Sequence, residues 1–174
     1  MRRLTAMMVG AVAVLGAGSA TAQVRGYVQL GPGLAIPLGD YKDEHKTGWL
    51  GQVASGISSG MWGGRVSGSY IRNDFEGTDF HTRILGAMAD LVVSPKSGGN
   101  VGPYLLGGIG FQNVKANIAA DPGSTDFAWN AGAGLTLKTG GFGIFVEGRF
   151  LQVRAAGGSL NVIPITAGLR FGGF

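Results

Sequence analysis

Residues 127–138 read Phe-Ala-Trp-Asn-Ala-Gly-Ala-Gly-Leu-Thr-Leu-Lys and show the clearest alternation in the chain. One face of this segment would carry the larger apolar residues with alanines: Phe127, Trp129, Ala131, Ala133, Leu135 and Leu137. The other face would carry small and polar residues: Asn130, Gly132, Gly134, Thr136 and Lys138. Because successive side chains of a β-strand point to opposite faces, the pattern predicts a strand with one apolar and one polar surface.

Similar segments recur along the chain between breaks rich in turn-forming residues. We predict eight strands, at residues 24–34 (extending as far as 36), 49–57, 62–72, 81–93, 102–114, 127–138, 142–153 and 160–171. The breaks between them alternate long and short, starting with the long polar segment 39–46. Long external loops and short periplasmic turns are typical of outer-membrane barrels, and an even strand count places both termini on the periplasmic side.

The composition favours a membrane barrel over a soluble one. Glycine contributes 34 of 174 residues and charged residues only 14%, which suits a tightly curved sheet with few exposed charges. A soluble barrel such as a lipocalin-like binder would bury its apolar residues inside. Here the apolar faces oppose faces that carry Arg, Asp, Glu, Asn and Gln, and aromatic residues lie near the strand ends. We therefore predict an all-β, eight-stranded antiparallel up-and-down transmembrane β-barrel in the bacterial outer membrane.

The N-terminus has the features of a cleavable secretory signal peptide. Arg2 and Arg3 precede a short apolar run, and Ala20 and Ala22 form an A-x-A cleavage site. The run is too short for a bilayer-spanning helix, which needs roughly 20 residues. We predict a signal peptide at residues 1–22 and a barrel domain at residues 23–174.

Charge and cysteine content exclude several function classes. Without residues 1–22 the chain keeps 12 basic and 10 acidic residues, a balance of +2 that does not indicate a nucleic-acid partner. The chain has no cysteine, which excludes a lipid-anchored lipoprotein and any thiolate site. We expect no cofactor and no metal site.

Several segments resemble the small outer-membrane barrels that include OmpA-type and OmpX-type domains. These segments are residues 33–41, 103–110, 146–150 and the C-terminal 163–174, which ends Leu-Arg-Phe-Gly-Gly-Phe. The resemblance implies that a terminal aromatic residue, Phe171 or Phe174, is read by the outer-membrane assembly machinery. Phe171 continues the apolar face of the last strand, whereas Phe174 is out of phase with it, so either residue could end the strand.

The predicted inner faces carry charged residues that could meet inside the barrel. Glu147 and Arg149 lie two residues apart and so share one face. With Arg25, Arg65, Asp90 and Arg170 they form a candidate lumen network, with Glu147 at its centre. Because buried charges are costly unless paired, and a small barrel is narrow, we predict a structural plug. The alternative is a narrow porin-like channel lined by these groups.

An enzymatic role is weighed on the two histidines, His45 and His81. Some eight-stranded outer-membrane barrels are lipid A deacylases or palmitoyltransferases that use a His and a Ser. Neither histidine here occurs in the His-x-Ser pattern of the deacylases, and we expect both to be exposed near loops. The prediction is a non-enzymatic, monomeric barrel with a structural or surface-interaction role, whose partners are outer-membrane lipid and lipopolysaccharide.

Overall fold

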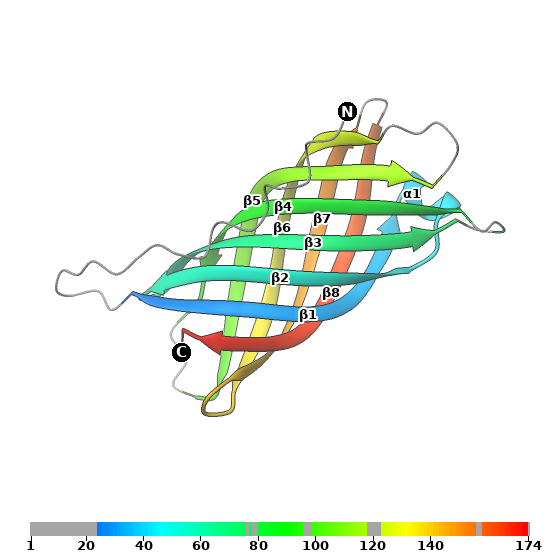
Figure 1. Cartoon of the computed structure of the whole chain (residues 1–174). Helices are drawn as coiled ribbons and strands as arrows, with labels where there is room; N and C mark the ends of the chain where they lie inside the picture. The colour runs from blue at the N-terminus through cyan, green and yellow to red at the C-terminus, as the bar shows by residue number, and fades with distance from the viewer. Residues whose placement is uncertain are drawn as a thin grey trace, which may run out of the picture.

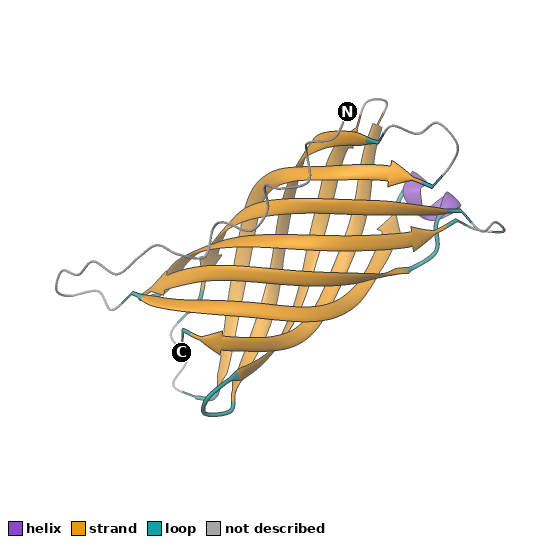
Figure 2. Cartoon of the chain, viewed as in Figure 1, coloured by secondary structure: helices purple, strands orange, loops and turns teal. Residues whose placement is uncertain are grey.

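The computed structural model describes residues 24–173 apart from 76, 78–79, 96–98, 118–122 and 156–157. Eight long strands run through this part of the chain: Arg25–Leu38 (β1), Gly48–Ser59 (β2), Trp62–Asp74 (β3), His81–Val93 (β4), Val101–Ala116 (β5), Ser124–Lys138 (β6), Gly143–Ala155 (β7) and Gly158–Gly172 (β8). A short helix, Asp40–Glu44 (α1), lies between β1 and β2 (Figure 1). Strands make up nearly all of the described chain (Figure 2).

The strands form one closed antiparallel barrel in chain order. Each strand pairs with its sequence neighbours, and β8 pairs with β1, where Leu34 lies opposite Ile165. Closure leaves no strand edge unpaired, as a sheet in contact with lipid requires. The predicted fold is confirmed. Among the described residues, no helix is both long and apolar enough to cross a bilayer.

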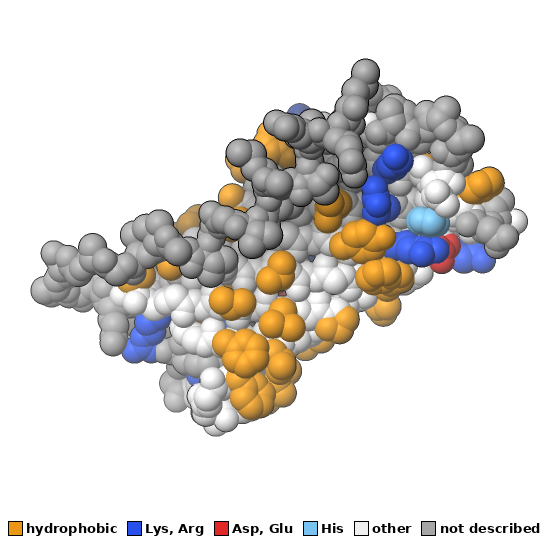
Figure 3. Space-filling model, viewed as in Figure 1, with side chains coloured by type: hydrophobic (Ala, Val, Ile, Leu, Met, Phe, Trp, Pro, Cys, Tyr) orange, Lys and Arg blue, Asp and Glu red, His pale blue; other side chains and the backbone are white. Residues whose placement is uncertain are grey.

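Side chains alternate between the lumen and the outer surface, as the sequence predicts. On β6, Leu135 is 53% exposed, while the neighbouring Thr136 is 4% exposed and faces inward. The same alternation places Val66 outside and Arg65 inside on β3. Hydrophobic side chains are therefore spread over the outside of the barrel (Figure 3). An apolar exterior around a polar interior is the arrangement of a transmembrane barrel.

The loop lengths differ from the predicted alternation. Residues 156–157 alone join β7 to β8, although we predicted a long external loop there. The reason is that the two strands stay paired beyond their predicted ends, as far as Ala155 opposite Gly158. At the other end of the barrel, residues 94–100 join β4 to β5, close to the predicted break at residues 94–101.

Side chains fill the lumen in layers along the barrel axis. The inward-facing residues of β4 show the order of these layers. From the end that carries α1, they are Thr82, Ile84, Gly86, Met88, Asp90 and Val92, and all except Gly86 are buried. A polar residue, apolar residues, a charged residue and a further apolar residue thus follow one another along the axis, the last belonging to a second cluster with Tyr104 and Leu106. The sequence prediction of a charged interior missed the apolar layer, which consists of Ala35, Leu50, Ile71, Ile84, Met88, Ala128, Leu151, Val153 and Val162.

Candidate functional site in the barrel lumen

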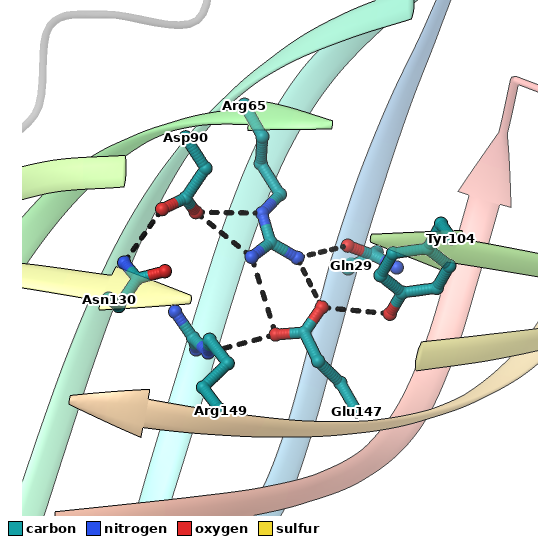
Figure 4. A network of polar contacts seen from close by, with 7 residues as sticks. All are labelled: Gln29, Arg65, Asp90, Tyr104, Asn130, Glu147 and Arg149. Atoms are coloured by element: carbon teal, nitrogen blue, oxygen red, sulfur yellow. Dashed lines mark hydrogen bonds and ion pairs between the residues drawn. The ribbon is translucent and has the colours of Figure 1, made fainter. Parts of the chain in front are cut away.

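The charged layer centres on Arg65, which reaches from β3 into the lumen (Figure 4). Its Nε and Nη2 donate to Oδ2 of Asp90 at 3.1 and 2.9 Å, across a directly opposed β3–β4 pair. Its Nη1 donates to Oε2 of Glu147 on β7, and its Nη2 lies 3.3 Å from the other oxygen of that carboxylate. One guanidinium therefore binds two carboxylates, an arrangement that suits its planar set of donors.

The bond between Arg65 and Glu147 spans the lumen. In a closed barrel of eight strands in chain order, β3 and β7 are four strands apart in both directions. Side chains from opposite walls thus meet at the axis. An eight-stranded barrel is narrow enough for side chains to fill it in this way.

Neutral side chains complete the hydrogen bonding of the two carboxylates. Tyr104 on β5 donates its hydroxyl to Oε2 of Glu147 at 2.8 Å, and Asn130 on β6 donates to Oδ1 of Asp90 at 2.8 Å. Gln29 on β1 accepts a bond from Arg65 at 3.3 Å. Arg149 forms an ion pair with Glu147 at 3.0 Å, although its N–H is not aligned for a hydrogen bond.

The network is buried and formally neutral, since its two arginines balance its two carboxylates. The side chains of Arg65, Asp90 and Glu147 have no exposed surface. Removing one member of such a group leaves an uncompensated buried charge, which typically costs about 3–5 kcal/mol. The arrangement joins opposite walls of the barrel.

Lumen-facing glycines make the space that the larger network side chains occupy. A Cβ added at Gly134 would lie 2.3 Å from the Tyr104 ring, and one added at Gly132 would lie 2.7 Å from Cγ of Arg149. The alternation along β6 predicts both glycines on the inner face, but it does not predict which side chains lie against them. It also does not assign Gln29, Tyr104 or Asn130 to the network, because cross-strand register is not visible in the pattern of one strand.

Two predicted members of the network lie outside it. Arg25 is exposed at the first residue of β1. Arg170 stacks on Tyr27, with its guanidinium carbon 3.7 Å from the ring centroid, and donates to the Gly173 carbonyl at 3.0 Å. Both therefore belong to the barrel end that holds the chain termini.

The predicted assembly and export signals are only partly within the described residues. Phe171 is 45% exposed on the outer face of β8, which ends at Gly172. Phe174, Ala20 and Ala22 lie outside the described residues.

A small cavity separates the charged layer from the apolar layer. Its volume is about 10 Å³, roughly the room of one water molecule. Gln52 and Gln112 line it, and their buried amide atoms have no hydrogen-bond partner within the described chain. These groups are suitable partners for a buried water molecule, and the cavity is too small for a larger solute.

A polar cap lies beyond the apolar layer and contradicts one prediction. We expected His45 to be exposed, but it is only 6% exposed. Its ring packs between Tyr41 and Phe75, each at 4.0 Å between centroids, and its Nε2 shares a 2.8 Å hydrogen bond with the Thr82 hydroxyl. The helix α1, which directly precedes His45 in the chain, lies at this end of the barrel (Figure 1). Burial also raises the pKa of the Tyr41 phenol, which stays neutral. His81 lies at the start of β4, opposite Asp74.

Residues 4–171 match the family model described as the outer membrane protein beta-barrel domain. The chain belongs to this family. Membership implies the bacterial outer membrane as its location. No curated protein sequence matches the chain.

Solved structures of small outer-membrane barrels share this fold. Neisserial surface protein A is 14% identical, with a TM-score of 0.69 over 84% of this chain and 96% of its own. Ail, the attachment invasion locus protein of Yersinia pestis, is 17% identical, with a TM-score of 0.55 over 84% of this chain and 98% of its own. The outer membrane enzyme PagL is 18% identical, with a TM-score of 0.52 over 83% of this chain and 98% of its own. At these identities the similarity shows the fold alone.

Proposed function

We propose that this outer-membrane barrel has a closed lumen and serves as a membrane-embedded scaffold that presents its loop end to partners at the cell surface. The observation that carries the proposal is the buried bond between Arg65 and Glu147, which joins opposite walls across the lumen. The apolar layer closes the same path a second time. Ions cross an apolar constriction poorly, because it cannot replace their water of hydration.

The orientation and export of the barrel are part of the same proposal. Residues 1–22 would be removed on export, and both termini would face the periplasm. The capped end around α1 would then face outward. Among barrels of this fold, Ail is named for attachment and invasion, which shows that the architecture can accompany a surface role.

The narrow channel is the weaker reading, because the cavity beside Gln52 and Gln112 has room for about one water molecule. An enzymatic role, as in PagL, is not proposed. His45 shares a hydrogen bond with Thr82, which is buried and therefore unlike a nucleophilic serine exposed to lipid or solvent.

Solute uptake tests the closed lumen. The purified barrel is reconstituted into liposomes, and swelling is followed after dilution into isotonic arabinose, with a general porin as the positive control. The proposal predicts swelling no faster than in protein-free liposomes. Swelling that rises in proportion to the amount of barrel would overturn the closed lumen.

The surface role needs a separate test. Residues 75–80, which join β3 to β4, are replaced by a short turn, and the native fold is verified by heat-modifiable gel mobility. The scaffold reading predicts that cells with the replaced loop lose surface attachment that cells with the intact barrel show. Unchanged attachment would exclude this loop from the role.

A further inference from the structure

Three cations form a row across neighbouring strands on the outer surface of the barrel. Arg72 on β3 lies directly opposite Arg83 on β4, and Arg83 lies directly opposite Lys115 on β5. Their chain neighbours Ile71, Ile84 and Val114 belong to or pack against the apolar layer in the lumen, so the three cations point outward. The row lies at the same end of the barrel as α1.

Such a row is unfavourable without an anion. Directly opposed residues have Cβ atoms about 4.5–5.5 Å apart, and like charges at that spacing destabilise a sheet. Asp74 pairs with Arg72 at 3.2 Å, on a solvent-exposed site. Within the described chain, Arg83 and Lys115 form no ion pair. The row therefore has cationic charge that an external anion could neutralise.

Aromatic residues place the row at the level of the lipid headgroups. Trp49 and Tyr70 pack together at 5.3 Å between ring centroids, and Tyr70 lies two residues before Arg72 on the same outer face. Phe111 pairs edge-on with Phe127 and lies four residues before Lys115. Aromatic girdles mark the membrane interface, so the cations lie just beyond the hydrocarbon region.

The other end of the barrel lacks such a row. Among the described strand residues, its outward-facing positions are apolar or small, with Trp62, Leu91 and Val101 as examples. The cations of that end on the described strands, Arg25, Lys138 and Arg170, are in phase with lumen-facing residues. Figure 3 shows Lys and Arg side chains gathered near the α1 end, with hydrophobic side chains beside them.

We infer that Arg72, Arg83 and Lys115 form a binding site for the phosphate groups of a phosphorylated glycolipid of the outer leaflet, as lipopolysaccharide carries. A guanidinium binds phosphate in a bidentate manner, and a lysine adds a point charge. The position beside an aromatic girdle favours a lipid-borne phosphate over a soluble one. The inference names a partner for the proposed surface end and rests on the proposed orientation, but not on the closed lumen.

The test measures lipid binding to the full barrel in detergent. Native mass spectrometry follows titration with bisphosphorylated lipid A and, separately, with dephosphorylated lipid A. The R83Q/K115Q variant removes the two cations of the row that form no ion pair within the described chain. Arg154, an exposed cation near the same end on β7, provides the matched control R154Q. Heat-modifiable mobility verifies that each variant is folded.

The expected result is a loss of affinity for bisphosphorylated lipid A of about tenfold or more in R83Q/K115Q, with less than a twofold change in R154Q. Dephosphorylated lipid A should bind all three proteins equally. Equal loss in R83Q/K115Q and R154Q would overturn the site. The site would also be overturned if inositol hexakisphosphate bound as tightly as lipid A and competed with it, because the ligand would then be a soluble polyanion. Liposome swelling reports the lumen separately, so the two proposals fail independently.

Discussion

A substitution of Arg65 tests the charged network in the lumen through the stability of the barrel. Replacing Arg65 with methionine keeps much of its volume but removes all the hydrogen bonds that Arg65 itself donates to Asp90 and Glu147. Asp90 then keeps only the 2.8 Å bond from Asn130, while Glu147 keeps Tyr104 and Arg149. Since a buried carboxylate is left without its cation, R65M should lower the free energy of unfolding by about 3–5 kcal/mol.

A second substitution separates lost charge balance from lost packing. The R65M/D90N variant removes the unpaired carboxylate and leaves Glu147 with Arg149 as a neutral pair. It should therefore recover about half of the loss, or roughly 2 kcal/mol. Because Arg65 and Asp90 are in contact, the effects of the two substitutions on the free energy of unfolding will not add. The difference from additivity measures the interaction between the two side chains.

The assay is urea unfolding in phospholipid vesicles, followed by tryptophan fluorescence and by heat-modifiable gel mobility. R154Q, at an exposed position of β7, should stay within about 0.5 kcal/mol of the unmodified protein. A loss in R65M below about 1 kcal/mol would refute the reasoning, because it would mean that Arg65 does not neutralise both carboxylates. A double variant less stable than R65M would refute the charge-balance explanation.

Other predictions address the space that Gly134 leaves for Tyr104, the apolar layer of the lumen and the export of the barrel. G134A should cost about 1–3 kcal/mol, since its Cβ would meet the Tyr104 ring at 2.3 Å, whereas G148A, with open space at its Cβ, should cost little in the same unfolding assay. L50A should cost about 2–4 kcal/mol by opening a cavity in the apolar layer, and liposome swelling should stay at the protein-free rate because the charged layer remains. N-terminal sequencing of protein from outer-membrane fractions should begin at Gln23, and an uncut N-terminus would contradict the predicted signal peptide.

The strand pattern was largely predictable from local sequence. The strand at residues 81–93 matches β4 at both ends, because alternation and flanking turn residues define it without reference to other strands. The inward position of Arg65 and Glu147 follows from the same alternation. Their contact does not, since it requires eight strands to close so that β3 and β7 face each other.

The remaining features depend on which inward-facing residues meet at one level of the barrel. Leu50 and Ile84 are inward by alternation, yet their joining in an apolar layer depends on register and on the stagger of the strands. The burial of His45 depends on α1, which forms in a segment whose polar composition indicated a solvated loop. Loop lengths were mispredicted because pairing continues past the last residue that alternates clearly.

The closed lumen is tested most directly by single-channel recording in planar lipid bilayers. The purified, folded barrel should insert without steady current steps, because the Arg65–Glu147 bond and the apolar layer block the same path. The R65M variant should also lack steady steps, since the apolar layer is intact. Steady conductance from the unmodified barrel, of uniform size and proportional to the number of inserted molecules, would contradict the account.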